Sequence, residues 1–427
     1  MKDVAGRATF RDVFSVGQFR ALWLAQILSV AGDRLALVAL TVLVFSRTHS
    51  PLMTAATYAV SYLPWLVGGL LLAGLADRYP RRRVMIVCDL VRCGLTAVMV
   101  ISGMPLPALV LLLFGVTMLA PPFESARAAI LPGILAGDRY VVGTAIARLT
   151  NQVGFVAGFA CGGVTVALAG PRVALAVDAA TFAVSALLIR FGVRTSAAPA
   201  ARLRGHAQAR AGARTSSVIR LMFGTKQLRV LTLLAWLAAF YVVPEGLAVP
   251  YARALGGGAV TAGLLLAAMP TGMGIGVIAF SRLVSPARRL RVMTPMAACS
   301  CLPLVACALK PGLTITMVIF AAAGALSAYQ LAANAAFVRA LPDRFRGQAF
   351  GIVMTGFSLG QSASLVAAGA LAQALPVPEV IAISGGLGTI AAVALAARWN
   401  RAVSDTSAAE YSPAGSRRQH APSAEGS

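Results

Sequence analysis

Charged residues are scarce in this chain. Of its 427 residues, 12% are Asp, Glu, Lys or Arg, whereas an ordinary soluble protein carries about 25%. The mean hydropathy is +0.80, and 58% of the residues are hydrophobic. These values exclude a soluble globular enzyme and a disordered protein.

Acidic residues and histidines are scarcer still. The chain has 14 Asp and Glu against 37 Lys and Arg, a net charge of +23, and three His. The basic residues are interleaved with long apolar runs rather than spread over a soluble surface, so we predict no nucleic-acid partner. Three His leave little for a metal site, and the six Cys lie in apolar stretches without zinc or disulfide spacing. We therefore expect no metal and no cofactor.

Long apolar runs are what the chain has in abundance. A helix needs about 20 apolar residues to cross a membrane, and we predict twelve such spans, at 19–45, 54–76, 84–103, 106–126, 141–168, 172–191, 230–252, 259–281, 292–309, 312–338, 348–373 and 377–398. Small residues are frequent in these spans, as close helix packing in lipid requires. The predicted fold class is an all-α membrane protein with twelve transmembrane helices in two six-helix bundles.

The basic residues fix the predicted orientation. With the N-terminus in the cytoplasm, 31 of the 37 Lys and Arg fall in inner segments and four in outer loops. This asymmetry follows the positive-inside rule, so we expect a multi-pass protein of the cell membrane with both termini cytoplasmic. The first seventeen residues lack the apolar core of a cleaved signal peptide.

Composition and an internal repeat divide the chain. Arg20-Ala-Leu and Arg229-Val-Leu open the first and seventh spans, and three further matches recur at nearly the same offset. Duplicated halves suit a carrier with its site between them. The predicted parts are an N-terminal bundle, a basic linker, a C-terminal bundle and a disordered tail, at 1–191, 192–228, 229–398 and 399–427.

One motif stands between the second and third spans. It reads Gly74-Leu75-Ala76-Asp77-Arg78-Tyr79-Pro80-Arg81-Arg82-Arg83. It resembles the major facilitator superfamily signature Gly-x-Leu-Ala-Asp-Arg-x-x-Arg-Arg. The resemblance implies an inner gate in which Asp77 faces the start of the eleventh helix at 347–351, with a contribution from Arg78, Arg81 and Arg82. The alternative is that Asp77 only orders a tight loop.

Further patterns resemble one branch of this superfamily, that of the enterobactin exporter and macrolide-efflux permeases. They are Gly32-Asp33, Ala126-Arg127-Ala128-Ala129-Ile130-Leu131-Pro132 and Val243-Pro244-Glu245-Gly246. The fifth span also resembles the antiporter motif Gly-x-x-x-Gly-Pro-x-x-Gly-Gly, through Gly154, Gly158, Gly162 and Gly163, with Phe159 in place of proline. The alternative reading of these glycines is close packing. The fourth span lacks the buried arginine of many proton-coupled drug exporters.

Apart from charges toward the span ends, six charged residues lie within the predicted spans: Asp33, Arg34, Asp89, Arg92, Asp178 and Glu245. Each needs a partner or a water-filled cavity. We predict a structural pair between Asp89 and Arg92, three residues apart on one helix, and a structural role for Asp178 beside Arg34. Asp33 and Glu245 lie on equivalent helices of the two halves and are candidates for proton coupling. The alternatives are a salt bridge between Asp33 and Arg34 and an outer-gate hydrogen bond at Glu245.

The other candidates are aromatic or neutral: Gln26, Tyr62, Trp65, Trp236, Tyr241, Gln330 and Asn334. Such a lining suits an amphiphilic organic molecule better than a sugar or an anion, although aromatics at helical spacing also serve packing. We therefore predict a monomeric, non-enzymatic exporter of a hydrophobic or amphiphilic small molecule, driven by proton antiport. An uptake carrier of the same fold is the alternative.

Overall fold

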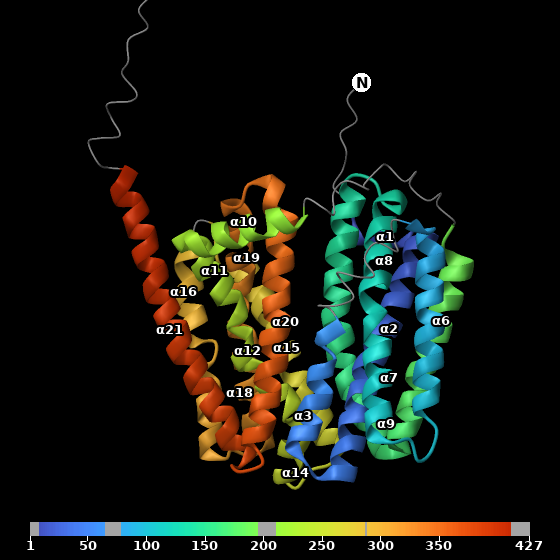
Figure 1. The fold of residues 1–427 in the computed structure, drawn as a ribbon. Coiled ribbons are helices and arrows are strands. Elements are labelled where there is room, and N and C mark those ends of the chain that lie inside the picture. Colours follow the sequence, from blue (N-terminus) through green and yellow to red (C-terminus); the bar gives the residue numbers. More distant parts are fainter. Residues whose placement is uncertain (1–7, 65–77, 195–210, 287, 411–427) are drawn as a thin grey trace, which may run out of the picture.

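The computed structural model describes residues 8–64, 78–194, 211–286 and 288–410, and their regular structure is helical throughout (Figure 1). The first half of the chain contains α1 (Phe10–Phe14), α2 (Gly17–Thr48), α3 (Pro51–Val60), α6 (Arg81–Met99), α7 (Leu106–Met118), α8 (Ala120–Ile134) and α9 (Asp138–Gly192). The helix α10 (Ala211–Gly224) then leads into the second half.

The second half begins with a helix in four pieces, α11 (Lys226–Trp236), α12 (Ala238–Tyr241), α13 (Val243–Gly246) and α14 (Ala248–Ala254). It continues with α15 (Ala259–Leu283), α16 (Arg289–Cys299), α17 (Leu302–Val305), η1 (Ala306–Leu309), α18 (Leu313–Leu326), α19 (Tyr329–Ala340), η2 (Asp343–Phe345), α20 (Arg346–Leu371) and α21 (Val377–Glu410). The two halves stand side by side with their long helices roughly parallel (Figure 1). We name the two ends of the molecule the α1 end and the α14 end.

Nine helical stretches of the described residues are long and apolar enough to span a membrane. They are Gly17–Thr48, Leu106–Ile134, Asp138–Gly192, Lys226–Gly246, Ala259–Leu283, Arg289–Leu309, Leu313–Ala340, Asp343–Leu371 and Val377–Arg401. Asp138–Gly192 has 55 residues and contains two predicted spans. The predicted spans 54–76 and 84–103 correspond to α3, which precedes residues outside the description, and to α6, which carries several charges. The number twelve therefore stays a prediction.

Local sequence explains the turns between these helices. Gly170 has φ +85°, a conformation that suits glycine, and with Pro171 it reverses the chain inside α9. The hydroxyl of Ser50 accepts a hydrogen bond from the Met53 N–H, and Pro51 occupies the first turn of α3. Pro244 and Gly246 fall where the seventh predicted span breaks into short pieces.

Helices extend into two of the predicted connecting segments. Residues 192–228 were predicted as a basic linker, and Ala211–Gly224 within them is helical. The tail was predicted to be disordered from residue 399, and α21 continues to Glu410. Between 399 and 410 the sequence has no Pro or Gly and includes several Ala, so nothing in it interrupts the helix.

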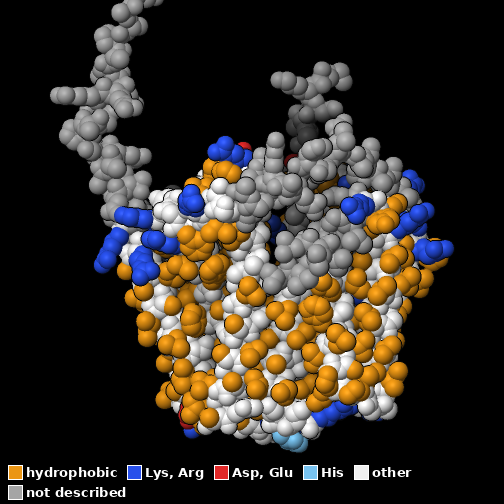
Figure 2. Space-filling view, viewed as in Figure 1, with side chains coloured by type: hydrophobic (Ala, Val, Ile, Leu, Met, Phe, Trp, Pro, Cys, Tyr) orange, Lys and Arg blue, Asp and Glu red, His pale blue; other side chains and the backbone are white. Residues whose placement is uncertain are grey.

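The surface matches a membrane environment. Apolar side chains cover the sides of the molecule in Figure 2, while Lys and Arg gather at its two ends, mainly the α1 end. Large apolar residues are well exposed along the helices, including Leu111, Leu168 and Ile390, with exposed fractions of 70%, 83% and 69%. Water would not tolerate so much contiguous apolar surface, but lipid would.

Glycine contacts join helices within and between the halves. The backbone and side chains of α2 pack directly against Gly154, Gly158 and Gly162. A Cβ at Gly158 would lie 2.5 Å from the Ala31 carbonyl oxygen. Gly163 instead faces α15 of the other half, where a Cβ would lie 3.0 Å from the Gly263 Cα. All four positions of the predicted glycine motif therefore lie at close helix contacts.

Candidate functional site

A buried arginine is the centre of the first half. Arg92 on α6 has a side chain that is 2% exposed, and its Nη2 lies 2.6 Å from Oδ1 of Asp33 on α2. Its Nη1 donates to the Ser29 hydroxyl at 3.1 Å and its Nε to the Val116 carbonyl at 3.2 Å. The Asp33 side chain is 29% exposed. An accessible carboxylate is thus held by a guanidinium that water does not reach.

This arrangement corrects two predicted pairs and one alternative. Arg92 pairs with Asp33 and not with Asp89, although Asp89 is one turn away on the same helix. Asp89 instead accepts a hydrogen bond from the Ser185 hydroxyl at 2.6 Å. Arg34 forms neither the predicted pair with Asp178 nor that with Asp33; its guanidinium carbon lies 4.0 Å from the ring centre of Phe155. The long Arg92 side chain reaches across to α2, so sequence proximity does not decide its partner.

A second polar group lies nearer the α1 end. Arg127 on α8 contacts Glu124 and donates through Nη1 to the Gln26 side-chain oxygen at 2.5 Å. The Gln26 amide nitrogen donates to the Asn151 side-chain oxygen at 2.6 Å. Gln26 is 2% exposed. Gln26, Ser29 and Asp33 thus lie along α2, where Arg127 bonds to Gln26 and Arg92 to Ser29 and Asp33, and Asp33 is the most accessible of the three.

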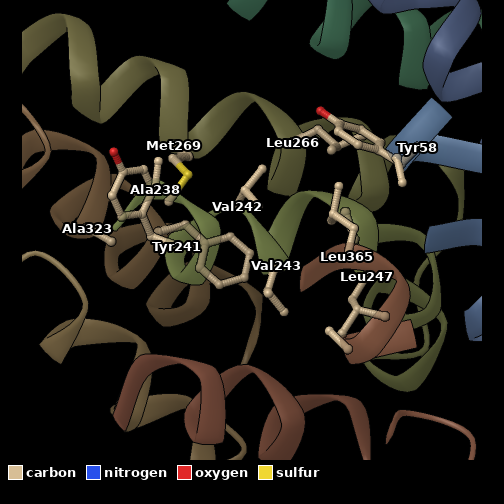
Figure 3. Packing of buried hydrophobic residues seen from close by; sticks show 14 of the residues in the cluster. Tyr58, Ala238, Tyr241, Val242, Val243, Leu247, Leu266, Met269, Ala323 and Leu365 are labelled. Carbon is tan, nitrogen blue, oxygen red and sulfur yellow. The ribbon is translucent and has the colours of Figure 1, made fainter. Parts of the chain in front are cut away.

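Glu245 on α13 joins the two halves. Its Oε2 accepts hydrogen bonds from the hydroxyls of Tyr58 at 2.7 Å and Tyr62 at 3.1 Å, both in the first half. Figure 3 shows Tyr58 extending from α3 into a cluster that contains Leu266 and Leu365 of the second half. Tyr58 is fully buried. Separating the halves at this level would break both bonds and expose the Glu245 carboxylate.

Arg34 lies near the same junction. Its positive charge acts on the Glu245 carboxylate and on the hydroxyls of Tyr58 and Tyr62. The Arg34 Nε is buried without a hydrogen-bond partner, and the Phe155 ring supports the guanidinium. The junction thus combines one cation, one acid and three aromatic rings, drawn from both halves.

The remaining candidates of the second half form a separate group. The Trp236 indole N–H donates to the Val353 carbonyl at 3.0 Å. The Gln330 amide donates to the Tyr241 hydroxyl, which is buried beside α19. Asn334 is exposed. Trp236 and Tyr241 therefore form hydrogen bonds within this half, and among the described residues no hydrogen bond or ion pair joins Gln330 or Asn334 to Asp33.

The predicted inner-gate motif is described only in part. Gly74 and Asp77 lie outside the described residues, as does the candidate Trp65. Arg78 is exposed. Arg81 donates to the Ala129 carbonyl at 2.7 Å, and Arg82 donates to the Arg190 carbonyl, so both tie α6 to neighbours in its own half.

Sequence reasoning missed two contacts between helices. It assigned Arg92 to a local pair, and it offered no partner for Tyr58. A surplus of acids over bases in the spans could have signalled that Arg92 serves more than one carboxylate. Over the described residues, no group of three His, Cys, Asp or Glu could hold a metal ion.

Comparisons with known proteins agree with this architecture. A profile of the Major Facilitator Superfamily matches residues 22–320 and 246–424. The MFS-type transporter YkuC of Bacillus subtilis (strain 168) is 26% identical over 182 residues, which are 42% of this chain and 42% of the relative's own length. That match therefore spans less than half of the relative.

Solved structures share the fold. A mutant of the nucleoside transporter NupG has a TM-score of 0.75 at 14% identity, covering 90% of this chain and 100% of that chain. A bacterial homologue of the lysosomal transporter Spinster, inward-facing and occupied, has a TM-score of 0.70 at 16% identity, covering 96% and 100%. With the matched profile and the apolar spans, these findings lead to one conclusion: the chain belongs to the major facilitator superfamily and is a multi-pass membrane transport protein, not an enzyme.

Proposed function

We propose that the protein exports a hydrophobic or amphiphilic small molecule from the cell in exchange for protons, by alternating access. The observation that carries the proposal is the Asp33–Arg92 pair, in which a 29% exposed carboxylate faces a 2% exposed guanidinium. A proton that binds Asp33 removes its charge and weakens its bond to Arg92. Proton binding at the accessible surface is thereby coupled to the packing of α2 against α6.

The gate assignment rests on Glu245. Tyr58 and Tyr62 hold it across the halves, so its two hydrogen bonds favour the state that is closed at this level. Opening there requires water to replace two buried bonds. Rocking of one half against the other around a central site would alternately make and break them. In this scheme Asp33 senses the proton and Glu245 closes the gate.

The substrate class follows from the lining. Phe155 and Tyr62 are aromatic and partly exposed, and charged groups are few around them. The motif resemblance to the enterobactin-exporter and macrolide-efflux branch supports export. An uptake carrier is the second candidate, because the same geometry works in both directions.

The test uses purified protein in liposomes with ethidium, an amphiphilic cation, as the probe. We expect a proton gradient to drive ethidium transport by the wild type, and Asp33→Asn to abolish that accumulation while downhill ethidium exchange survives. The matched control is Asp12→Asn on α1, outside the spans, which should transport normally. Uphill transport by Asp33→Asn would refute the coupling role. Transport driven only by the opposite gradient polarity would favour uptake.

Orientation is tested by labelling. With the exposed Cys161 and Cys299 replaced by Ala, a cysteine at His49 should react with an impermeant maleimide in intact cells. A cysteine at Phe10 should react only after permeabilisation. The reverse pattern would overturn a cytoplasmic N-terminus.

A further inference from the structure

The membrane-spanning part has more acids than bases. Apart from the Glu124–Arg127 pair nearer the α1 end and the exposed arginines outside the central part, the charged residues of the predicted spans are four acids and two arginines: Asp33, Asp89, Asp178, Glu245, Arg34 and Arg92. Arg92 is paired with Asp33, and the charge of Arg34 acts on Glu245. Among the described residues, neither Asp89 nor Asp178 forms an ion pair of its own.

Both surplus carboxylates are buried and incompletely bonded. The exposed fraction is 0% for Asp89 and 1% for Asp178. One oxygen of each, Oδ1 of Asp89 and Oδ2 of Asp178, lacks any hydrogen-bond partner. An ionised carboxylate in such a place would cost several kcal/mol, and this cost favours the neutral form of both. A bound metal ion does not explain them, because the described acids form no group of three that could hold one.

Asp178 differs from Asp89 in its position. A Cβ at Gly32 would lie 2.3 Å from Oδ1 of Asp178, so this carboxyl touches α2 one residue before Asp33. Thr181 is its one described side-chain partner, at 3.4 Å, whereas Ser185 binds Asp89 at 2.6 Å. Asp178 is therefore the less satisfied of the two.

The groups that face Asp178 come from three helices. Asp33 faces it from α2, Arg92 and Cys93 from α6, and Thr181 from its own helix. Arg92 interacts most strongly with Asp33, to which it is bonded, and more weakly with Asp89 and Asp178. One guanidinium thus lies within reach of two carboxyls, one accessible and one enclosed.

We propose that Asp33 and Asp178 share one proton, and that Arg92 pairs with whichever of the two lacks it. In the arrangement seen here, Asp33 is ionised and paired while Asp178 holds the proton. In the other arrangement the O–H bond of Asp178 breaks, the proton forms an O–H bond on Asp33, and Arg92 turns to Asp178. Asp178 is then the buried site that holds the proton, and Asp33 is the accessible site through which that proton exchanges with water.

This sharing deepens the proposed coupling and rests on it for its use in transport. When the proton leaves Asp33, Arg92 faces two ionised carboxylates, a net charge of −1 inside the membrane. A cationic substrate beside Asp33 would restore neutrality. The site would therefore hold either one proton or one cation, which favours amphiphilic cations as substrates.

The test needs no substrate. Infrared difference spectra of the purified wild type, taken between acidic and alkaline buffer, should contain the carbonyl band of a carboxylic acid that loses its proton. Asp178→Asn should lose that band and should release about one proton fewer per protein on alkalinisation, as a pH dye reports. Asp89→Asn is the matched control, equally buried, and should keep the Asp178 band.

Three outcomes overturn the proposal. They are an unchanged band in Asp178→Asn, its loss in Asp89→Asn alone, and equal proton release by wild type and Asp178→Asn. If Asp178→Asn does not reach the membrane, Gly32→Ala serves instead. Its added Cβ pushes the Asp178 carboxyl from α2 and should shift the band without removing it; an unshifted band contradicts the contact. Failure of ethidium transport would count against the proposed function only.

Discussion

The junction at Glu245 makes a quantitative prediction about the gate. Tyr58→Phe removes the hydroxyl that donates to the Glu245 Oε2 at 2.7 Å and leaves the buried ring in place. A hydrogen bond to a charged group contributes about 1.5–3 kcal/mol. Because 1.4 kcal/mol corresponds to a tenfold change in an equilibrium constant, the closed state should lose about ten- to hundredfold in population relative to the open state.

Distances between spin labels measure this shift. Met53 on α3 and Val260 on α15 are both exposed and lie in different halves near the α14 end. With labels at these positions, Tyr58→Phe should increase the population with the long label-to-label distance at the expense of the short one. Tyr62→Phe should have a smaller effect, because the Tyr62 hydroxyl lies farther from Glu245, at 3.1 Å.

The control is Tyr251→Phe. Tyr251 is also buried, but its hydroxyl contacts Thr316 at 3.2 Å within the second half, so its loss should leave the distances unchanged. The reasoning is refuted if Tyr58→Phe gives the wild-type distribution, or if Tyr251→Phe shifts it equally.

Three further predictions concern stability. Arg92→Met should lower the stability of the purified protein by about 3 kcal/mol, because it leaves Asp33 unpaired, and adding Asp33→Asn should restore much of the thermal unfolding temperature; no restoration contradicts the pair. Gly163→Ala should cost about 1–3 kcal/mol by overpacking against Gly263, whereas Gly133→Ala, with open space around it, should cost little in the same assay. Hydrogen bonds from Thr9 lower the pKa of Asp12, so its support of α1 is present above the ordinary carboxyl pKa and is lost as the pH falls through the lowered value; hydrogen exchange in α1 should show this dependence, and Asp12→Asn should abolish it.

The sequence predicts the helices well because a membrane span is a local property. About 20 apolar residues define each one, whatever surrounds them. The breaks at Pro244 and Gly170 are also local, but their consequences are not. Pro244 lies where one span breaks into four short helices, and Gly170 reverses the chain between two spans.

Side-chain partners could not be predicted in the same way. Arg92 lies three residues from Asp89 yet reaches Asp33 on another helix, because helix packing sets which groups face each other across a gap. Tyr58 and Glu245 are 187 residues apart in sequence, and only the docking of the two halves brings them together. The sequence did predict that charged residues within the spans need partners.

The short connections at the α14 end have a practical consequence. The links between helices there have two to six residues in the described structure, and the reversal at Gly170 has no separate loop. An antibody or other binder would therefore find few residues to contact at this face. At the opposite end, α10 is a helix of 14 residues outside the long parallel helices (Figure 1). A rigid fusion partner for electron cryomicroscopy should therefore be attached beside α10, and binder selection should present that face.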